Sequence, residues 1–128
     1  MMVGIVLVSH SALLAEGLAT LLEQIGSSEV PVAVAGGMVD GSTGTSSELV
    51  GAALAAADRG DGVVVIPDLG SAVLTVKTVL ADGNTHGAVL VDAPFVEGAV
   101  AAAVTAASGA SVEEVAEAAR QARDVPKL

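Results

Sequence analysis

Two residues of this sequence, His10 and Asp68, have side chains suited to group-transfer chemistry. Each directly follows a short apolar run, residues 3–8 for His10 and a run ending at Pro67 for Asp68. A neutral imidazole is a nucleophile near neutral pH, and a phosphorylated ring nitrogen remains a good leaving group. A carboxylate can hold one ring nitrogen, leave the other free to react and stabilise positive charge on the ring. We therefore predict that Asp68 orients His10 as a phosphorylated nucleophile.

Small polar residues beside this pair provide hydrogen-bond donors for phosphate oxygens. They are Ser9, Ser11, Gly70 and Ser71. Backbone N–H groups at the start of a helix are suited to the same task, and Gly70 permits close approach of the backbone. Each position also has an ordinary structural explanation. His10 is then a loop histidine with common hydrogen bonds, and Asp68 or Ser71 only caps a helix.

A glycine-rich segment over residues 36–46 is the second candidate part of a site. Its candidate contacts for an anion are Gly37, Thr45 and Ser46. Turn formation explains its glycines equally well. The segment contains no Gly-Lys-Ser/Thr motif, and no Gly-x-Gly-x-x-Gly follows the first apolar run. Nucleotide and dinucleotide sites of those two kinds are therefore absent.

Short apolar runs alternate with helical patterns along the whole chain. The patterns predict strands over residues 3–8, 30–35, 62–66 and 87–91, and helices over 13–25, 45–58, 71–80, from 94, and 111–123. This alternation indicates a three-layer α/β fold, a mostly parallel sheet with helices on both faces. Chemistry in such folds lies beyond the carboxyl ends of the strands. Residues 9–11, 36–46, 67–71 and 92–97 should therefore meet at one edge.

Local signals predict several helix starts and the surroundings of two further titratable residues. Thr45 and Ser111 each begin a capping box, with a glutamate three residues later, and Pro94 suits the first turn of a helix. His86 should be a solvated residue at the opposite edge of the sheet. Glu97 either shapes the site or is simply an acid at a helix start.

Composition limits the class of protein. The 128 residues predict a single domain, residues 1–128, with 52% hydrophobic residues, one Phe and no Trp, Tyr or Cys. Without Cys, and with two histidines expected at opposite ends, we predict no metal site. The net charge of −10 disfavours nucleic acid and anionic membranes and favours a basic protein partner. With neither a convincing signal peptide nor a membrane-spanning run, we expect a cytoplasmic protein.

Four motifs in order resemble one known family across nearly the whole chain. They are residues 8–11 with 14–18, residues 44–46, residues 68–72 and residues 92–99. Together they resemble the phosphocarrier subunits of phosphoenolpyruvate-dependent dihydroxyacetone kinases (DhaM subunits), which are related to mannose-type EIIA domains of the phosphotransferase system.

The resemblance implies a specific role for the chain. His10 would be phosphorylated by the general phosphocarrier HPr, and Asp68 would be its carboxylate partner. The acceptor would be ADP held on the nucleotide-binding subunit of dihydroxyacetone kinase. The resemblance also implies a homodimer, and we expect no cofactor bound by this chain itself.

Two positions depart from the family pattern. The family usually has Asn where this chain has Thr75, and commonly an acid where it has Lys77. These departures concern the partner face more than the His10 chemistry.

Two other functions stay open. A mannose-type EIIA domain of sugar transport would use the same histidine with an EIIB acceptor. A regulatory or assembly module without enzymatic activity would not need His10.

Overall fold

In the computed structural model, which describes residues 2–83 and 85–128, four strands alternate with helices. The strands are β1 (Gly4–Ser9), β2 (Val32–Gly36), β3 (Val63–Pro67) and β4 (Ala88–Leu90). The helices are α1 (Ala12–Ile25), α2 (Ser47–Ala57), α3 (Gly70–Ala81), α4 (Phe95–Ala107), α5 (Val112–Gln121) and the short 3₁₀ helix η1 (Ala122–Asp124). Among the described residues, no helix is both long and apolar enough to cross a bilayer.

The four strands form a single sheet in the order β2-β1-β3-β4, and each neighbouring pair is parallel. In the register, Ser9 at the end of β1 pairs with Gly36 of β2, and Val8 pairs with Pro67 of β3. The residues that follow β1 and β3 therefore emerge side by side at the carboxyl edge. The parallel sheet predicted from the apolar runs is confirmed.

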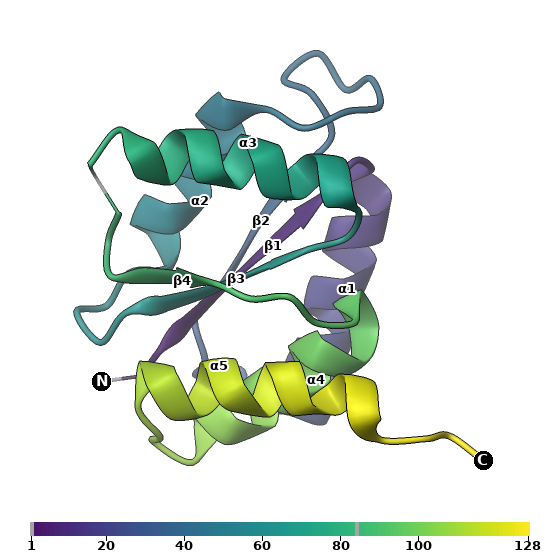
Figure 1. Ribbon diagram of the computed structural model, residues 1–128, viewed down its shortest axis with the longest axis vertical. Coiled ribbons are helices and arrows are strands. Elements are labelled where there is room, and N and C mark those ends of the chain that lie inside the picture. Colours follow the sequence, from purple (N-terminus) through teal and green to yellow (C-terminus); the bar gives the residue numbers. More distant parts are fainter. Residues whose placement is uncertain (1, 84) are drawn as a thin grey trace.

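Helices cover both faces of the sheet, which confirms the three-layer α/β fold. Figure 1 shows α2 and α3 on one face and α1, α4 and α5 on the other. Alternate residues of β1 enter the two cores because successive strand side chains point to opposite faces. Val6 and Val8 join the core under α2 and α3, whereas Ile5 and Leu7 join the other core.

Small residues allow α1 to start directly against the end of β2. A Cβ atom built on Gly36 would lie 2.7 Å from the Cα of Ala12 and 3.0 Å from the carbonyl oxygen of Ser11. Real Cβ atoms are not found this close to backbone atoms, so a larger residue at position 36 would push α1 away. The glycine therefore sets the distance between the start of α1 and the sheet, where His10 lies.

The ends of the elements differ slightly from the predictions. Thr45, predicted as the N-cap of the second helix, does not cap it; Ser46 has the extended backbone of an N-cap and accepts a hydrogen bond from the Leu49 N–H. The predicted strand over residues 30–35 begins only at Val32, after Pro31, which has no N–H to donate. The capping box at Ser111 is confirmed.

Candidate active site: a histidine held between two strand ends

The main chain around His10 is fixed by the glycine-rich loop that follows β2. The Gly37 N–H donates to the Ser9 carbonyl, and the Gly44 N–H donates to the His10 carbonyl, both at 3.0 Å. Gly37 has a φ of +71°, a left-handed conformation that favours glycine. These two N–H groups are thus used to hold the backbone. The sequence left anion contact and turn formation open for Gly37, and its φ and its hydrogen bond to Ser9 are those of a turn.

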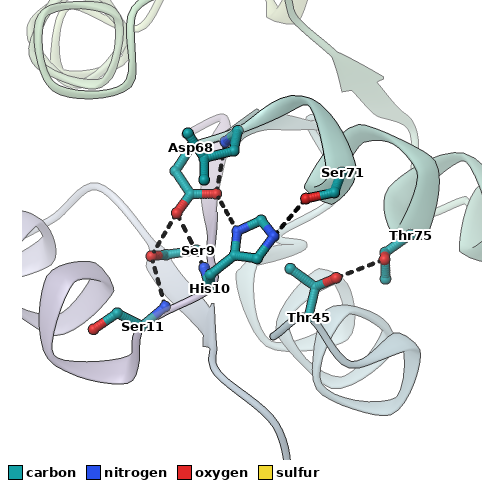
Figure 2. Close-up of polar contacts among 8 residues, drawn as sticks. Ser9, His10, Ser11, Thr45, Asp68, Ser71 and Thr75 are labelled. Carbon is teal, nitrogen blue, oxygen red and sulfur yellow. Dashed lines mark hydrogen bonds and ion pairs between the residues drawn. The ribbon is translucent and has the colours of Figure 1, made fainter. Parts of the chain in front are cut away.

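Asp68 holds His10 through its ring and its backbone. Its Oδ1 lies 2.9 Å from His10 Nδ1, and its Oδ2 accepts from the His10 N–H at 3.0 Å, as Figure 2 shows. The same carboxylate accepts from the Ser9 hydroxyl at 2.9 Å and from the Leu69 N–H at 2.7 Å. Only 8% of the Asp68 side chain is exposed. The structure therefore brings together the two residues that the sequence singled out.

The ionisation of Asp68 decides which nitrogen of His10 is free. Burial raises the pKa of Asp68, but hydrogen bonds from the His10 backbone and ring, Ser9 and Leu69 outweigh it and bring the pKa below its ordinary value of 3.8. Asp68 is then an anion at neutral pH and can only accept hydrogen bonds. In the neutral ring, His10 Nδ1 therefore carries the proton, and Nε2 presents a lone pair.

The reactive side of the ring faces Ser71. The Ser71 hydroxyl lies 2.6 Å from His10 Nε2. In the neutral ring Nε2 carries no proton, so the hydroxyl donates this hydrogen bond. The sequence suggested Ser71 as a helix cap or a phosphate donor, and neither suggestion anticipated this contact. The ring is partly accessible, since 20% of the His10 side chain is exposed.

The start of α3 is open beside this contact. Its N-cap residue, Leu69, makes no side-chain capping bond, and a Cβ atom built on Gly70 would meet nothing within 4 Å. The first N–H groups of a helix carry partial positive charge and attract anions. Gly70 and Ser71 thus form an open helix start beside Nε2, and both remain candidate phosphate contacts.

The two serines beside His10 have separate tasks. Ser9 is fully buried, donates to Asp68 and accepts from the Ser11 N–H at 3.0 Å. A hydroxyl with both partners inside the protein is not available to phosphate, so Ser9 supports Asp68 instead of contacting phosphate as predicted. Ser11 is exposed and caps α1 by accepting from the Leu14 N–H. It remains a candidate phosphate contact.

A pair of threonines beside the site joins the glycine-rich loop to α3. Thr45 Oγ1 and Thr75 Oγ1 lie 2.7 Å apart (Figure 2). Thr75 lies one helical turn after Ser71, on the same face of α3. The sequence did not indicate this contact, although the spacing of four residues between Ser71 and Thr75 was a usable signal. Ser46, the third predicted residue of this loop, is a nearly buried helix cap.

A cleft of about 520 Å³ opens on the other side of Asp68. It lies between α3 and the segment that follows β3 and β4, and Lys77, Leu90 and Asp92 are among its lining residues. The sequence did not indicate the cleft. The described residues contain no cluster of three or more His, Asp or Glu side chains that would hold a metal ion.

The two other titratable residues considered from the sequence lie outside this constellation. Glu97, in the first turn of α4, is 3.2 Å from Lys127 Nζ, and that contact lowers the pKa of Glu97. His86 was predicted to be solvated, but its Nδ1 lies 3.0 Å from Asp58 Oδ2 and only 23% of its side chain is exposed. The prediction that His86 is a solvated residue was therefore wrong, because its ring is paired with Asp58 and largely covered.

One family model matches most of this chain. The family model described as "PTS system fructose IIA component" matches residues 4–116. The chain belongs to this family. The match runs from β1 to the middle of α5, and His10, Asp68 and Ser71 lie within it.

Curated relatives within this group support the resemblance to DhaM subunits. One from Listeria innocua, 33% identical over 89% of this chain and 94% of its own length, is named phosphoryl donor subunit DhaM of PEP-dependent dihydroxyacetone kinase 2. One from Escherichia coli K12, with the corresponding DhaM name, is 39% identical over 89% of this chain. The aligned region spans only 25% of the Escherichia coli relative's length and 27% of a relative from Providencia stuartii.

A solved structure shares the fold. The crystal structure of EF1359, titled as a protein of unknown function, superimposes with a TM-score of 0.83 at 32% identity, covering 94% of this chain and 95% of that one. The fold that carries His10 is thus shared with nearly the whole of that chain.

Proposed function

We propose that this chain is a phosphohistidine carrier that accepts a phosphoryl group from HPr on His10 and passes it to ADP on the nucleotide-binding subunit of dihydroxyacetone kinase. The supporting observation is the pair of contacts on one ring, with Asp68 on Nδ1 and the Ser71 hydroxyl on Nε2. The names of the DhaM relatives support the choice of kinase system. The proposal treats residues 1–128 as a single carrier domain.

Phosphoryl uptake would proceed by in-line displacement at Nε2. The Ser71 hydroxyl rotates away from Nε2, whose lone pair attacks the phosphorus of the donor's phosphohistidine. A bond forms between Nε2 and phosphorus, while the bond to the donor's ring nitrogen breaks and returns its electron pair to that nitrogen. The His10 ring becomes positively charged, and the anionic Asp68 beside Nδ1 stabilises that charge.

The start of α3 would receive the transferred group. The Ser71 hydroxyl, released from Nε2, donates to a phosphoryl oxygen together with the first N–H groups of α3. In the second transfer, an oxygen of the terminal phosphate of ADP attacks phosphorus, and the Nε2–phosphorus bond breaks with its electron pair returning to Nε2. His10 is then neutral again, with Nδ1 still held by Asp68.

Charge and assembly complete the proposal. The net charge of −10 favours encounter with a basic partner face and makes transfer sensitive to salt. With these proposed partners the chain would act in the cytoplasm, and the resemblance to DhaM subunits favours a homodimer. Light scattering on the purified protein tests the dimer: a mass twice that of the 12.4 kDa chain is expected, and a monomer at all concentrations would contradict it.

Intact-mass analysis tests the carrier role. The protein is incubated with phosphoenolpyruvate, enzyme I and HPr, and we expect one acid-labile phosphate on the wild type and on the control His86→Ala, and none on His10→Ala. The control removes the other histidine of the chain. Absence of phosphate on the wild type with an active donor would reject the carrier role and favour a regulatory or assembly module.

A sugar-transport EIIA domain is the second candidate function. The description of the matching family, a fructose IIA component, supports it. The two functions share the chemistry of His10 and differ in the acceptor. Phosphorylated protein is therefore mixed either with the kinase subunit loaded with ADP or with mannose-type EIIB domains. Loss of phosphate to the kinase subunit is expected, and transfer only to EIIB would assign the chain to sugar transport.

A further inference from the structure

We propose that the hydroxyl pair of Thr45 and Thr75 positions the Ser71 hydroxyl against His10 Nε2. The two threonines are positioning residues that act through Ser71 and do not touch the phosphoryl group. The expected effect on rate rests on the proposed function, because it concerns how fast Nε2 is phosphorylated. The geometric part is tested separately, by a measurement on the protein alone.

The contacts form a closed circuit around the site. The Gly44 N–H donates to the His10 carbonyl at 3.0 Å, which ties the loop to the main chain of the histidine. Thr45, the next residue, meets Thr75 of α3 at 2.7 Å. One turn earlier on α3, the Ser71 hydroxyl returns to the ring of His10 at 2.6 Å. The backbone and the ring of one residue are thereby linked through α3.

Hydrogen bonds from the Asp68 N–H to the Val8 carbonyl and from the Leu69 N–H to Asp68 hold the residues just before α3. The first turns of the helix itself rest on the sheet mainly through apolar contacts. The residues of α3 that are fully buried are Ala72 and Val76, both without long side chains. Leu69 and Leu74 are 61% and 67% exposed, and the N-cap provides no side-chain capping bond. Apolar contact is not directional and permits small sliding movements of a helix. A hydrogen bond between two hydroxyls defines a position more narrowly.

The position of Ser71 matters because reactive geometry is sensitive to small displacements. Misplacement of a reacting group by about 1 Å can cost a large part of the rate. At 2.6 Å, the hydroxyl of Ser71 lies where it orients the lone pair of Nε2 before transfer and reaches a phosphoryl oxygen after it. Loss of the Thr45–Thr75 contact would broaden the distribution of Ser71 positions and leave Asp68 unchanged.

A set of threonine variants tests the inference in the transfer reaction. Thr75→Val removes the hydroxyl at nearly constant volume, and we expect phosphoryl uptake from phosphorylated HPr to slow about fivefold, the effect of one lost hydrogen bond. Thr75→Ser should restore most of the rate. The matched control is Thr78→Val on the same helix, because the exposed Thr78 hydroxyl donates to the Leu74 carbonyl of its own helix. It should transfer at the wild-type rate.

A double-mutant cycle with Ser71→Ala separates positioning from general destabilisation. If Thr75 acts through Ser71, Thr75→Val should have no further effect once the serine hydroxyl is removed. An equal slowing in both backgrounds would overturn the inference. Thr45→Val approaches the same contact from the loop and replaces Thr75→Val in the cycle if that variant does not fold.

Nitrogen-15 NMR of His10 keeps the inference testable without any partner protein. The Nε2 chemical shift reports the hydrogen bond from Ser71, and in Thr75→Val it should move towards the value measured in Ser71→Ala. A shift unchanged from the wild type would overturn the inference. If the shift moves as expected but the wild type takes up no phosphate, the positioning role stands and the proposed function fails.

Discussion

The protein contains two histidine–aspartate pairs at opposite ends of its sheet, and the two pairs differ in their surroundings. His10 and Asp68 lie 2.9 Å apart at the carboxyl edge, and His86 and Asp58 lie 3.0 Å apart at the amino edge. Both contacts use Nδ1, and the exposed fractions of the two histidines are similar, 20% and 23%. Distance alone would therefore rank the pairs as equals.

The carboxylates separate the two pairs. Asp68 is 8% exposed and accepts four hydrogen bonds, including one from the buried Ser9 hydroxyl. Asp58 is 27% exposed and accepts two, from His86 and the Gly60 N–H. A carboxylate with several fixed donors cannot change its orientation, so Asp68 determines the direction of the His10 ring.

The histidines also differ in what surrounds their second nitrogen. Nε2 of His10 faces the Ser71 hydroxyl and the open start of α3. Within the described part of the chain, Nε2 of His86 makes no hydrogen bond, and His86 lies in a turn with a φ of +53°. The comparison teaches that a histidine–aspartate contact becomes a candidate site only where a second element, here the start of α3, faces the other ring nitrogen.

The largest expected difference between the pairs is in phosphoryl transfer. Asp68→Asn keeps the shape of the side chain but removes its charge, and we expect uptake from HPr to slow by about 10- to 100-fold because the ring loses its orientation and its counter-charge. Asp58→Asn is the matched control and should transfer at the wild-type rate. Stopped-flow or quench-flow assays measure both, and equal slowing in the two variants would remove the distinction between the pairs.

The buried serine should make the next largest difference. Ser9→Ala leaves Asp68 and the Ser11 N–H each without one partner, and we expect the free energy of unfolding to fall by about 1–3 kcal/mol. In Ser27→Ala the free energy of unfolding should fall by less, because the Ser27 hydroxyl accepts from the nearby Glu29 N–H at an exposed site. Urea denaturation measures both changes. An unchanged free energy of unfolding in Ser9→Ala would show that the hydrogen bond from Ser9 to Asp68 does not stabilise the fold.

Acid should weaken both pairs in the same direction. The pKa of Asp68 lies below 3.8 in the folded state for the reasons given above, and hydrogen bonds from Gly60 and His86 also lower the pKa of Asp58. A lowered pKa contributes stability above the unfolded value, and that stability is lost as the pH falls through the folded pKa.

Two Asp→Asn variants test this pH dependence through the free energy of unfolding. The stability difference between wild type and Asp68→Asn should shrink as the pH is lowered from about 4, the range in which the Asp68 carboxylate takes up a proton. For Asp58→Asn the stability difference from wild type should also shrink at low pH, but by less, because Asp58 is more exposed. Urea denaturation at each pH is the assay, and a difference that grows towards low pH would contradict the assigned ionisation.

The smallest expected effect is that of replacing the second histidine. His86→Asn keeps a residue type that tolerates left-handed backbone, and it loses a contact that is partly exposed to solvent. We expect the free energy of unfolding to change by less than about 0.5 kcal/mol. Thermal denaturation gives the value, and a loss of several times this size would show that the amino-edge pair stabilises the fold.

The sequence contained most of the fold because its apolar runs are short, continuous and separated by helical patterns. Runs such as residues 63–66 are buried on both faces, and only a parallel sheet between helices accommodates them. Errors were confined to the ends of elements. Thr45 and Ser46 both suit an N-cap, and only the backbone dihedrals, φ −118° and ψ 123° at Ser46, distinguish them.

The candidate site was predictable only in part. His10 and Asp68 follow strands that a parallel sheet places at one edge, so their proximity could be expected from the order of elements. Burial of the Ser9 hydroxyl could not be expected, because Ser9 and Ser11 look equivalent beside His10 in the sequence. Which of them faces inward depends on how β1 ends.

The sequence by itself determined the layers of this protein, the edge at which its chemistry lies and the two residues most suited to it. The tertiary structure decided the contacts that make a site of them: the Ser71 hydroxyl on Nε2 and the Thr45–Thr75 pair. Apolar periodicity is a property of each segment and can be read locally. A hydrogen bond between residues 61 positions apart depends on angles and distances accurate to a few tenths of an ångström, which only the packing of helices on the sheet sets.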